Sequence, residues 1–94
     1  MTSLDERIRF AIEHKRLLRV VYLGKARVVE PHDYGVQKGA TKLLFYQRQP
    51  TEGWRMLEPP KCESCEPLER TFPGSRGGAH RRHFTWDAVY ARVT

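Results

Sequence analysis

Two cysteines are the whole thiol content of this 94-residue chain, and no apolar run in it approaches the roughly 18 residues that a membrane-spanning helix needs. The opening segment, MTSLDERIRF, lacks the basic start and the apolar stretch of a secretory signal. With so few cysteines and no export signal, the expected compartment is the reducing cytoplasm. Internal repeats and low-complexity tracts are absent as well. These absences exclude a membrane protein, a disulfide-rich secreted domain and a repeat protein.

Acidic residues are too few to balance the basic ones. Eleven aspartates and glutamates stand against 17 lysines and arginines, which gives a formal net charge of +6. This balance favours polyanionic partners such as nucleic acid, nucleotides or other phosphates, and the alternative is a charged surface that only keeps the protein soluble. Hydrophobic residues make up 39% of the chain and charged residues 30%, a composition typical of one small globular domain.

Motifs for catalysis are missing too. The sequence contains no G-x-S-x-G, no H-E-x-x-H and no paired-carboxylate pattern near a histidine. We therefore expect a protein that is not an enzyme and that needs no cofactor.

The amino-terminal segment carries the pattern of a helix. Ser3 and Glu6 are spaced as a capping box, in which each side chain bonds the backbone of the other. Apolar residues then recur at helical spacing, at Leu4, Ile8, Ala11 and Ile12. The pattern predicts a helix over about residues 3–16, with Lys15 and Arg16 in its last turn, where basic side chains match the helix dipole.

After this helix the pattern changes to short, β-branched and aromatic runs. Strands are expected over residues 17–22, 26–31, 41–48, 54–59, 61–69 and 87–93. Pro31 is expected to end the second strand because proline cannot donate to the ladder, and Gly35 and Gly39 are expected to bracket a loop. One helix followed by five or six short strands predicts a mainly β domain, a small barrel or strongly bent sheet over about residues 17–94.

Read in order, several segments resemble the WYL domain, a small SH3-like or Sm-like barrel of bacterial transcription regulators and defence-linked proteins. They are AIEHKRLLRVVYLGKARVVEPHDYG, GATKLLFYQ, GWRMLEPPKCESCEPLERTFPG and the AVYARV ending. The position of the tripeptide that names the family holds Lys42-Leu43-Leu44, and Tyr46 follows on the same strand. The resemblance covers nearly the whole chain, so it implies one domain over residues 1–94. It also implies a ligand-binding module that regulates transcription or phage defence.

The predicted ligand site gathers basic and aromatic residues at the mouth of the barrel: Arg27, His32, Tyr46 and Arg55 in one concavity, with Lys61 and Arg76 near its rim. Their convergence is implied by the resemblance. Arginine suits phosphate and tyrosine can stack on a base, so the expected ligand is a nucleotide or single-stranded nucleic acid. The alternatives are a structural Arg–Glu pair, a tyrosine that is merely amphipathic, and a protein–protein adaptor or homo-oligomer without a small ligand.

The segment RVVEPHDYG, residues 27–35, admits two interpretations. In one it is a turn in which Asp33 bonds local backbone and His32 is solvated. In the other, His32 takes part in binding by donating to a phosphate or stacking on a base. The basic segment SRGGAHRRHF, residues 75–84, is likewise either a polyanion-binding loop or an ordinary solvated one.

Cys62 and Cys65 form a lone C-x-x-C motif. We expect them to be small core residues, and hence neither a disulfide nor a metal site. A Cys2His2 zinc site with His80 and His83 is the second hypothesis, because four ligands of the right type occur in the right order. A thioredoxin-like redox pair is the third, although that motif belongs at the start of a helix.

Overall fold

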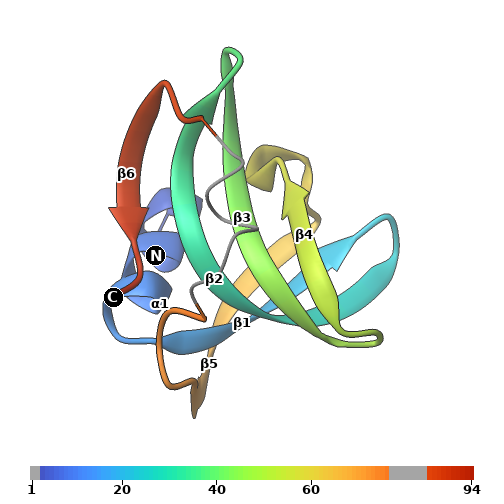
Figure 1. The fold of residues 1–94 in the computed structure, drawn as a ribbon. Coiled ribbons are helices and arrows are strands. Elements are labelled where there is room, and N and C mark those ends of the chain that lie inside the picture. The colour runs from blue at the N-terminus through green and yellow to red at the C-terminus, as the bar shows by residue number, and fades with distance from the viewer. Residues whose placement is uncertain (1–2, 77–84) are drawn as a thin grey trace.

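The computed structural model describes residues 3–76 and 85–94. The elements are helix α1 (Leu4–Glu13), strands β1 (Arg16–Tyr22), β2 (Lys25–Gln37), β3 (Ala40–Gln49) and β4 (Gly53–Leu57), the 3-10 helix η1 (Pro59–Lys61), and strands β5 (Ser64–Thr71) and β6 (Ala88–Arg92). The strands form one antiparallel sheet in the order β4-β3-β2-β1-β5, with β6 paired to β2 (Figure 1). The mainly β, barrel-like fold with one helix is thus confirmed. In the part of the chain described, no helix has the length and apolar character to cross a membrane.

Helix α1 begins as the sequence predicts and ends earlier. The Ser3 side chain accepts from the backbone of Glu6, and the Glu6 side chain accepts from the backbone of Ser3, so the capping box is present. The predicted stripe is buried at Ile8, Ala11 and Ile12. The predicted extension to residue 16 was wrong, because Lys15 turns the chain with a φ of 53° and the next residue already starts β1.

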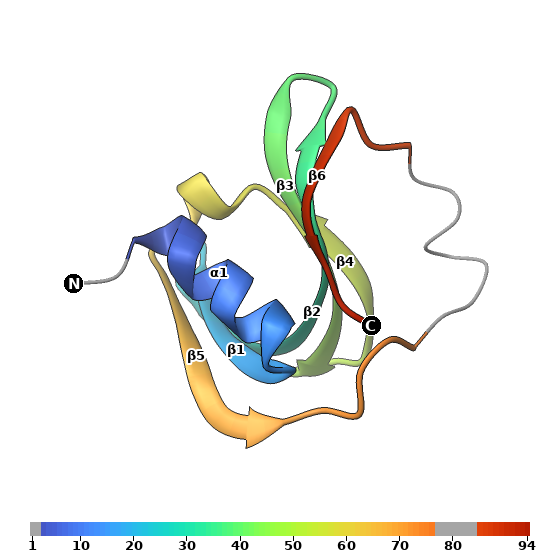
Figure 2. The same cartoon turned by 90° about the vertical axis from the view of Figure 1, so that its left-hand side faces the viewer.

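The helix covers the open side of the curved sheet. It contacts β1, β2, β5 and β6 and lies against the concave side of the sheet (Figure 2). Its buried stripe joins residues from the strands in one hydrophobic core, whose fully buried members include Leu18, Val20, Leu43 and Phe45. The helix is therefore part of the core and cannot be removed without exposing it.

Two tight turns set the register of the central strands. Leu23-Gly24 joins β1 to β2, and Lys38-Gly39 joins β2 to β3, and all four residues have positive φ angles. Turns of this kind match the twist of a hairpin, and glycine adopts them without strain.

Strand β2 is much longer than the sequence predicts. The expected end at Pro31 was wrong, because the register with β3 shifts between Pro31 and Asp33, and a bulge is a place where a strand tolerates proline. The expected loop at Gly35 was also wrong. A Cβ atom there would lie 2.1 Å from the carbonyl oxygen of Ala88, so the glycine lets β6 approach and pair with β2.

The remaining strands were placed correctly in order, with shifted ends. The start of the fifth strand is displaced: Lys61, predicted to begin it, is the last residue of η1, which two consecutive prolines begin, and β5 starts only at Ser64. Residues 77–84, which contain most of the basic segment predicted as a loop, lie outside the described residues.

Candidate functional site

The register sorts the side chains of β3 and its neighbours onto two faces of the sheet. Opposed residues of antiparallel strands share a face, and consecutive residues along a strand alternate. Phe45, which is fully buried in the core, pairs with Arg55, and we call this side the core face. Tyr46 pairs with Glu30 on β2 and with Trp54 on β4, and this side is the outer face.

Two of the six predicted site residues lie on the core face. The Nη1 atom of Arg55 donates to the carbonyl oxygen of Trp54 at 2.9 Å. Arg27 pairs with a buried valine of β1, and its Nη1 atom donates to Oε1 of Gln47 at 3.0 Å. Tyr46 lies on the other side of the sheet, so the predicted single concavity was wrong.

Three other predicted residues meet on the outer face. Arg76 follows β5 and returns to this face, where its guanidinium carbon lies 3.7 Å from the centroid of the Tyr46 ring. The backbone amide of Arg76 donates to Nε2 of His32 at 3.1 Å. Lys61 does not join them; its ammonium lies 3.0 Å from the carboxylate of Glu58 at the end of η1. The structure thus unites His32, Tyr46 and Arg76 and leaves the other three apart.

A buried carboxylate holds two arginines at the centre of this group. The Glu30 side chain is only 1% exposed. Nε of Arg76 donates to Oε1 of Glu30 at 2.8 Å, and Nη2 donates to Oε2 at 3.0 Å. Nε of Arg48 donates to the same Oε2 at 2.7 Å. We call Glu30, Arg48 and Arg76 the arginine clamp; its charge-assisted and bidentate bonds belong to the strongest class of protein hydrogen bonds.

The clamp carries a surplus of positive charge. Burial raises the pKa of the Glu30 carboxyl, but the hydrogen bonds and charges of Arg76 and Arg48 outweigh burial and hold that pKa below its ordinary value. The hydrogen bond to Glu30 raises the pKa of Arg76 in turn. One negative and two positive groups leave a net charge of +1. The exposed Glu52 carboxylate also acts electrostatically on Arg76, so it offsets part of this charge.

Both arginines have side-chain N–H groups that donate to no described residue. Within residues 3–76 and 85–94, the Arg48 side chain donates only through Nε, so its two terminal nitrogens have no acceptor there. Arg76 donates through Nε and Nη2, so its Nη1 has no acceptor among the same residues. The side chains are 35% and 41% exposed, so a ligand in solvent can reach these donors. The clamp therefore presents several fixed N–H groups to an anion.

Aromatic rings line one side of the clamp. Tyr46 packs edge-on against Trp54 with 5.6 Å between ring centroids, and Trp54 packs edge-on against His32 at 4.8 Å. His32 also stacks on Phe72 at 5.8 Å. Tyr46 and Trp54 are partly exposed, and Arg76 already covers one face of the Tyr46 ring. These rings form a wall beside the clamp rather than an open stacking platform.

The interpretation of residues 27–35 as a turn with a solvated histidine was wrong. His32 is 0% exposed, and Asp33 is buried too and accepts from Nε of Arg92 at 3.0 Å. Nδ1 of His32 lies 2.8 Å from the carbonyl oxygen of Glu30. Since a carbonyl can only accept, Nδ1 carries the proton and Nε2 accepts from Arg76, which defines a neutral ring.

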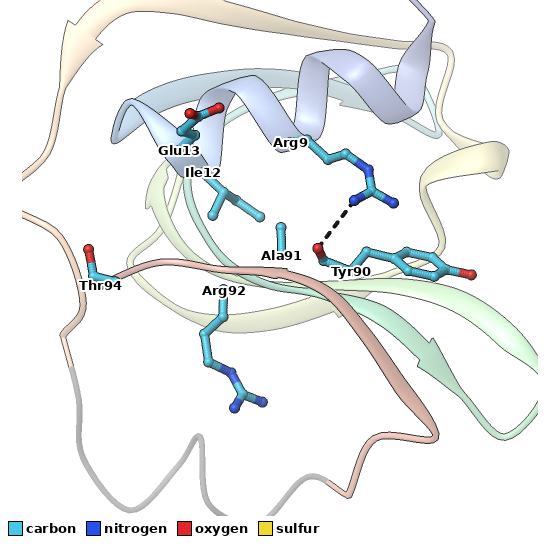
Figure 3. Close-up of a pocket in the computed structure, with 7 residues that line it drawn as sticks. All are labelled: Arg9, Ile12, Glu13, Tyr90, Ala91, Arg92 and Thr94. Carbon is cyan, nitrogen blue, oxygen red and sulfur yellow. Dashed lines mark hydrogen bonds between the residues drawn. The ribbon is translucent and has the colours of Figure 1, made fainter.

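A separate groove of about 490 Å³ runs between α1 and β6. Figure 3 shows Arg9 reaching from the helix to Tyr90, and Nη1 of Arg9 donates to the Tyr90 carbonyl oxygen at 3.2 Å. Nε of Arg9 donates to Asp5 at 2.8 Å, and Arg92 points away from the helix. Arg9 is thus held by two acceptors at one side of this groove.

The two cysteines differ in their surroundings. Cys65 is 2% exposed within the hydrophobic core, as the core interpretation predicts, and Cys62 is half-buried. Both are free thiols. Burial raises the pKa of Cys62, and it raises that of Cys65 to about 12, so both are protonated at neutral pH. Zinc and redox chemistry both need a thiolate. The zinc hypothesis stays untested, because His80 and His83 lie outside the described residues.

Sequence reasoning missed two components of the site. Glu30 was placed in the second strand with a structural Arg–Glu pair as an alternative, but its arginine partners were not predicted, because the long-range return of Arg76 is encoded by no local pattern. Arg48 was not among the predicted site residues, although the alternation of side chains along the strand is sufficient to place it on the face of Tyr46.

No protein-family model, no curated protein and no solved structure matches this chain.

Proposed function

We propose that this chain is a non-enzymatic, ligand-binding regulatory module that binds a nucleotide or single-stranded nucleic acid by its phosphate at the arginine clamp. The observation that supports this most is the pair of partly exposed guanidinium groups held by one buried carboxylate, each with N–H groups that no described residue accepts from. The planar fork of arginine fits phosphate oxygens. Because Glu30 orients both arginines beforehand, a phosphate meets a prepared site and little conformational entropy is lost on binding.

The aromatic wall favours a ligand that carries a base as well as a phosphate. Tyr46 and Trp54 are partly exposed beside the clamp, and a base can pack against the exposed parts of these rings. Such contact is tolerant of sequence. This feature supports a nucleotide or a short single strand over inorganic phosphate.

Binding fits the surroundings of His32 better than catalysis does. The ring is fully buried, and its two nitrogens bond backbone groups of Glu30 and Arg76, so the histidine is not presented to a substrate as a general base. The resemblance to WYL domains supports a regulatory purpose, in transcription or phage defence. In that role the domain acts through a protein partner or as an oligomer.

Binding of a fluorescent oligothymidylate, followed by anisotropy at several salt concentrations, tests this function. We expect log affinity to fall by about 0.7 per phosphate contacted for each tenfold rise in salt. Arg48→Ala should weaken binding about tenfold and flatten the salt dependence, because it removes charge-assisted bonds. Arg55→Ala removes the same charge from the core face and is the matched control; it should leave the affinity within about twofold. Equal losses in both variants would contradict a specific clamp.

A protein–protein adaptor is the second candidate. Two of the large hydrophobic residues exposed in the described chain, Val89 and Tyr90, lie on β6, at 44% and 41% exposure. In the described part of the sheet, β6 pairs with β2 alone, and a strand with one unpaired edge can add another chain. An association that survives high salt, with no oligonucleotide binding, is the result that favours this candidate.

A further inference from the structure

Strand β2 carries a second buried carboxylate that holds an exposed arginine. Asp33 is 2% exposed, and Nε of Arg92 on β6 donates to its Oδ1 at 3.0 Å. The Arg92 side chain is 53% exposed, and its two terminal nitrogens donate to no acceptor within residues 3–76 and 85–94. Figure 3 shows this side chain pointing away from α1. Asp33 thus holds Arg92 as Glu30 holds Arg48, by a bond to Nε that leaves the outer nitrogens available.

The bulge in β2 brings the two carboxylates to the same face of the sheet. In a regular strand, residues three apart point to opposite faces. Here the register with β3 shifts between Pro31 and Asp33. Glu30 lies opposite Tyr46 of β3, on the outer face. Asp33 lies opposite Leu44, which is two residues along β3 and therefore on the outer face as well. At about 3.4 Å per residue, the two positions are about 7 Å apart along the strand.

Two anchored arginine positions at this separation fit a ligand that has two separated phosphates. The sugar between neighbouring phosphates of a nucleic acid spans a comparable distance, whereas the phosphates of a diphosphate share an oxygen and lie much closer. We infer that Arg92 is a second phosphate-binding position beside the arginine clamp, so that the site takes a single strand in preference to a mononucleotide. This inference rests on the proposed function and chooses between the two ligands named there. Because Asp33 neutralises Arg92, the second position acts through directed N–H groups more than through net charge.

Three thymidine nucleotides separate the number of phosphates from their spacing. Each has one base: the 5′-phosphate has one phosphate, the 5′-diphosphate has two adjacent ones, and the 3′,5′-bisphosphate has one on either side of the sugar. Calorimetric titrations of the full chain at constant salt and pH give the three affinities. We expect the bisphosphate to bind about tenfold more tightly than the monophosphate, and the diphosphate to stay within about threefold of it. Equal gains for the bisphosphate and the diphosphate overturn the inference, because charge and not spacing then decides the affinity.

Arg92→Lys tests the residue without leaving the buried carboxylate unpaired. Lysine keeps the charge and can pair with Asp33, but it lacks the terminal fork. We therefore expect the advantage of the bisphosphate over the monophosphate to fall to about twofold. Arg19→Lys makes the same change at an exposed position of β1 and is the matched control, which should keep the full advantage. An undiminished advantage in Arg92→Lys overturns the role of Arg92.

NMR signals of the arginine side-chain Nε–H groups in the wild type separate this inference from the function on which it rests. We expect the monophosphate to shift the signals of Arg48 and Arg76, and the bisphosphate to shift that of Arg92 as well. If both ligands shift Arg48 and Arg76 and leave Arg92 unmoved, the second position is wrong and the proposed function stands. If none of the three nucleotides shifts any of these signals, the proposed function is contradicted and the inference falls with it.

Discussion

Replacing Glu30 with glutamine tests what holds the arginine clamp together. The change keeps the shape of the side chain and removes its charge, while the two arginines keep theirs. The new amide nitrogen also meets an arginine N–H group, so at least one of the three bonds becomes a contact between donors.

The cost follows from burial and exposure. Breaking a fully buried ion pair costs about 3–5 kcal/mol, but Arg48 and Arg76 are 35% and 41% exposed and regain water. We therefore expect Glu30→Gln to lower the free energy of unfolding by about 2–4 kcal/mol at pH 7. The free energy of unfolding of a small domain is roughly 5–15 kcal/mol in total, so urea denaturation readily measures such a loss.

The same comparison has a defined pH dependence. The folded-state pKa of Glu30 lies below its ordinary value of 4.5, so its stabilisation is present above pH 4.5 and is lost as the pH falls through the folded-state pKa. The difference between wild type and Glu30→Gln should therefore shrink in acid. Glu52→Gln removes an exposed charge near Arg76 and is the matched control, expected within about 0.5 kcal/mol of wild type. Equal stability of wild type and Glu30→Gln at pH 7 would refute the reasoning.

Three further changes test the fold. Ile8→Asp places a charge at a fully buried position of α1 and should unfold the domain or nearly so, which circular dichroism would detect; a native melting curve would contradict this. Tyr34→Phe removes the 2.8 Å hydrogen bond to Asp5 and should cost about 0.5–1.5 kcal/mol in urea denaturation, and no loss would mean the bond is unimportant. Replacing Cys62 and Cys65 with valine or alanine should leave a folded protein that has lost about 1–3 kcal/mol and melts identically with and without a chelator; unfolding of the wild type on chelation would instead reveal a structural metal.

The sequence was informative where structure depends on neighbours along the chain. The capping box and the apolar stripe of α1 needed only local spacing, and the alternation in β3 placed Tyr46 and Arg48 on one face. It failed for β2. Pro31 and Gly35 ordinarily end strands, and the structure tolerates them because a bulge accommodates the first and close approach of β6 requires the second.

The candidate site could not be predicted from the sequence because it, too, depends on contacts between residues far apart in the chain. Whether Arg55 shares a face with Tyr46 depends on the register of β4 against β3, and one residue of slip reverses the answer. Glu30 reads as a surface acid until Arg76, 46 residues later, returns to cover it. Long-range contacts of this kind carry no local signature in a single sequence.

The central claim is that phosphate binds the arginine clamp on the outer face and not the core face. NMR spectra of the arginine side-chain Nε–H groups during titration with oligothymidylate test it most directly, because each arginine reports its own position. We expect the signals of Arg48 and Arg76 to shift and saturate together, while those of Arg27 and Arg55 stay in place. Shifts at Arg27 and Arg55 with Arg48 and Arg76 unmoved would contradict it.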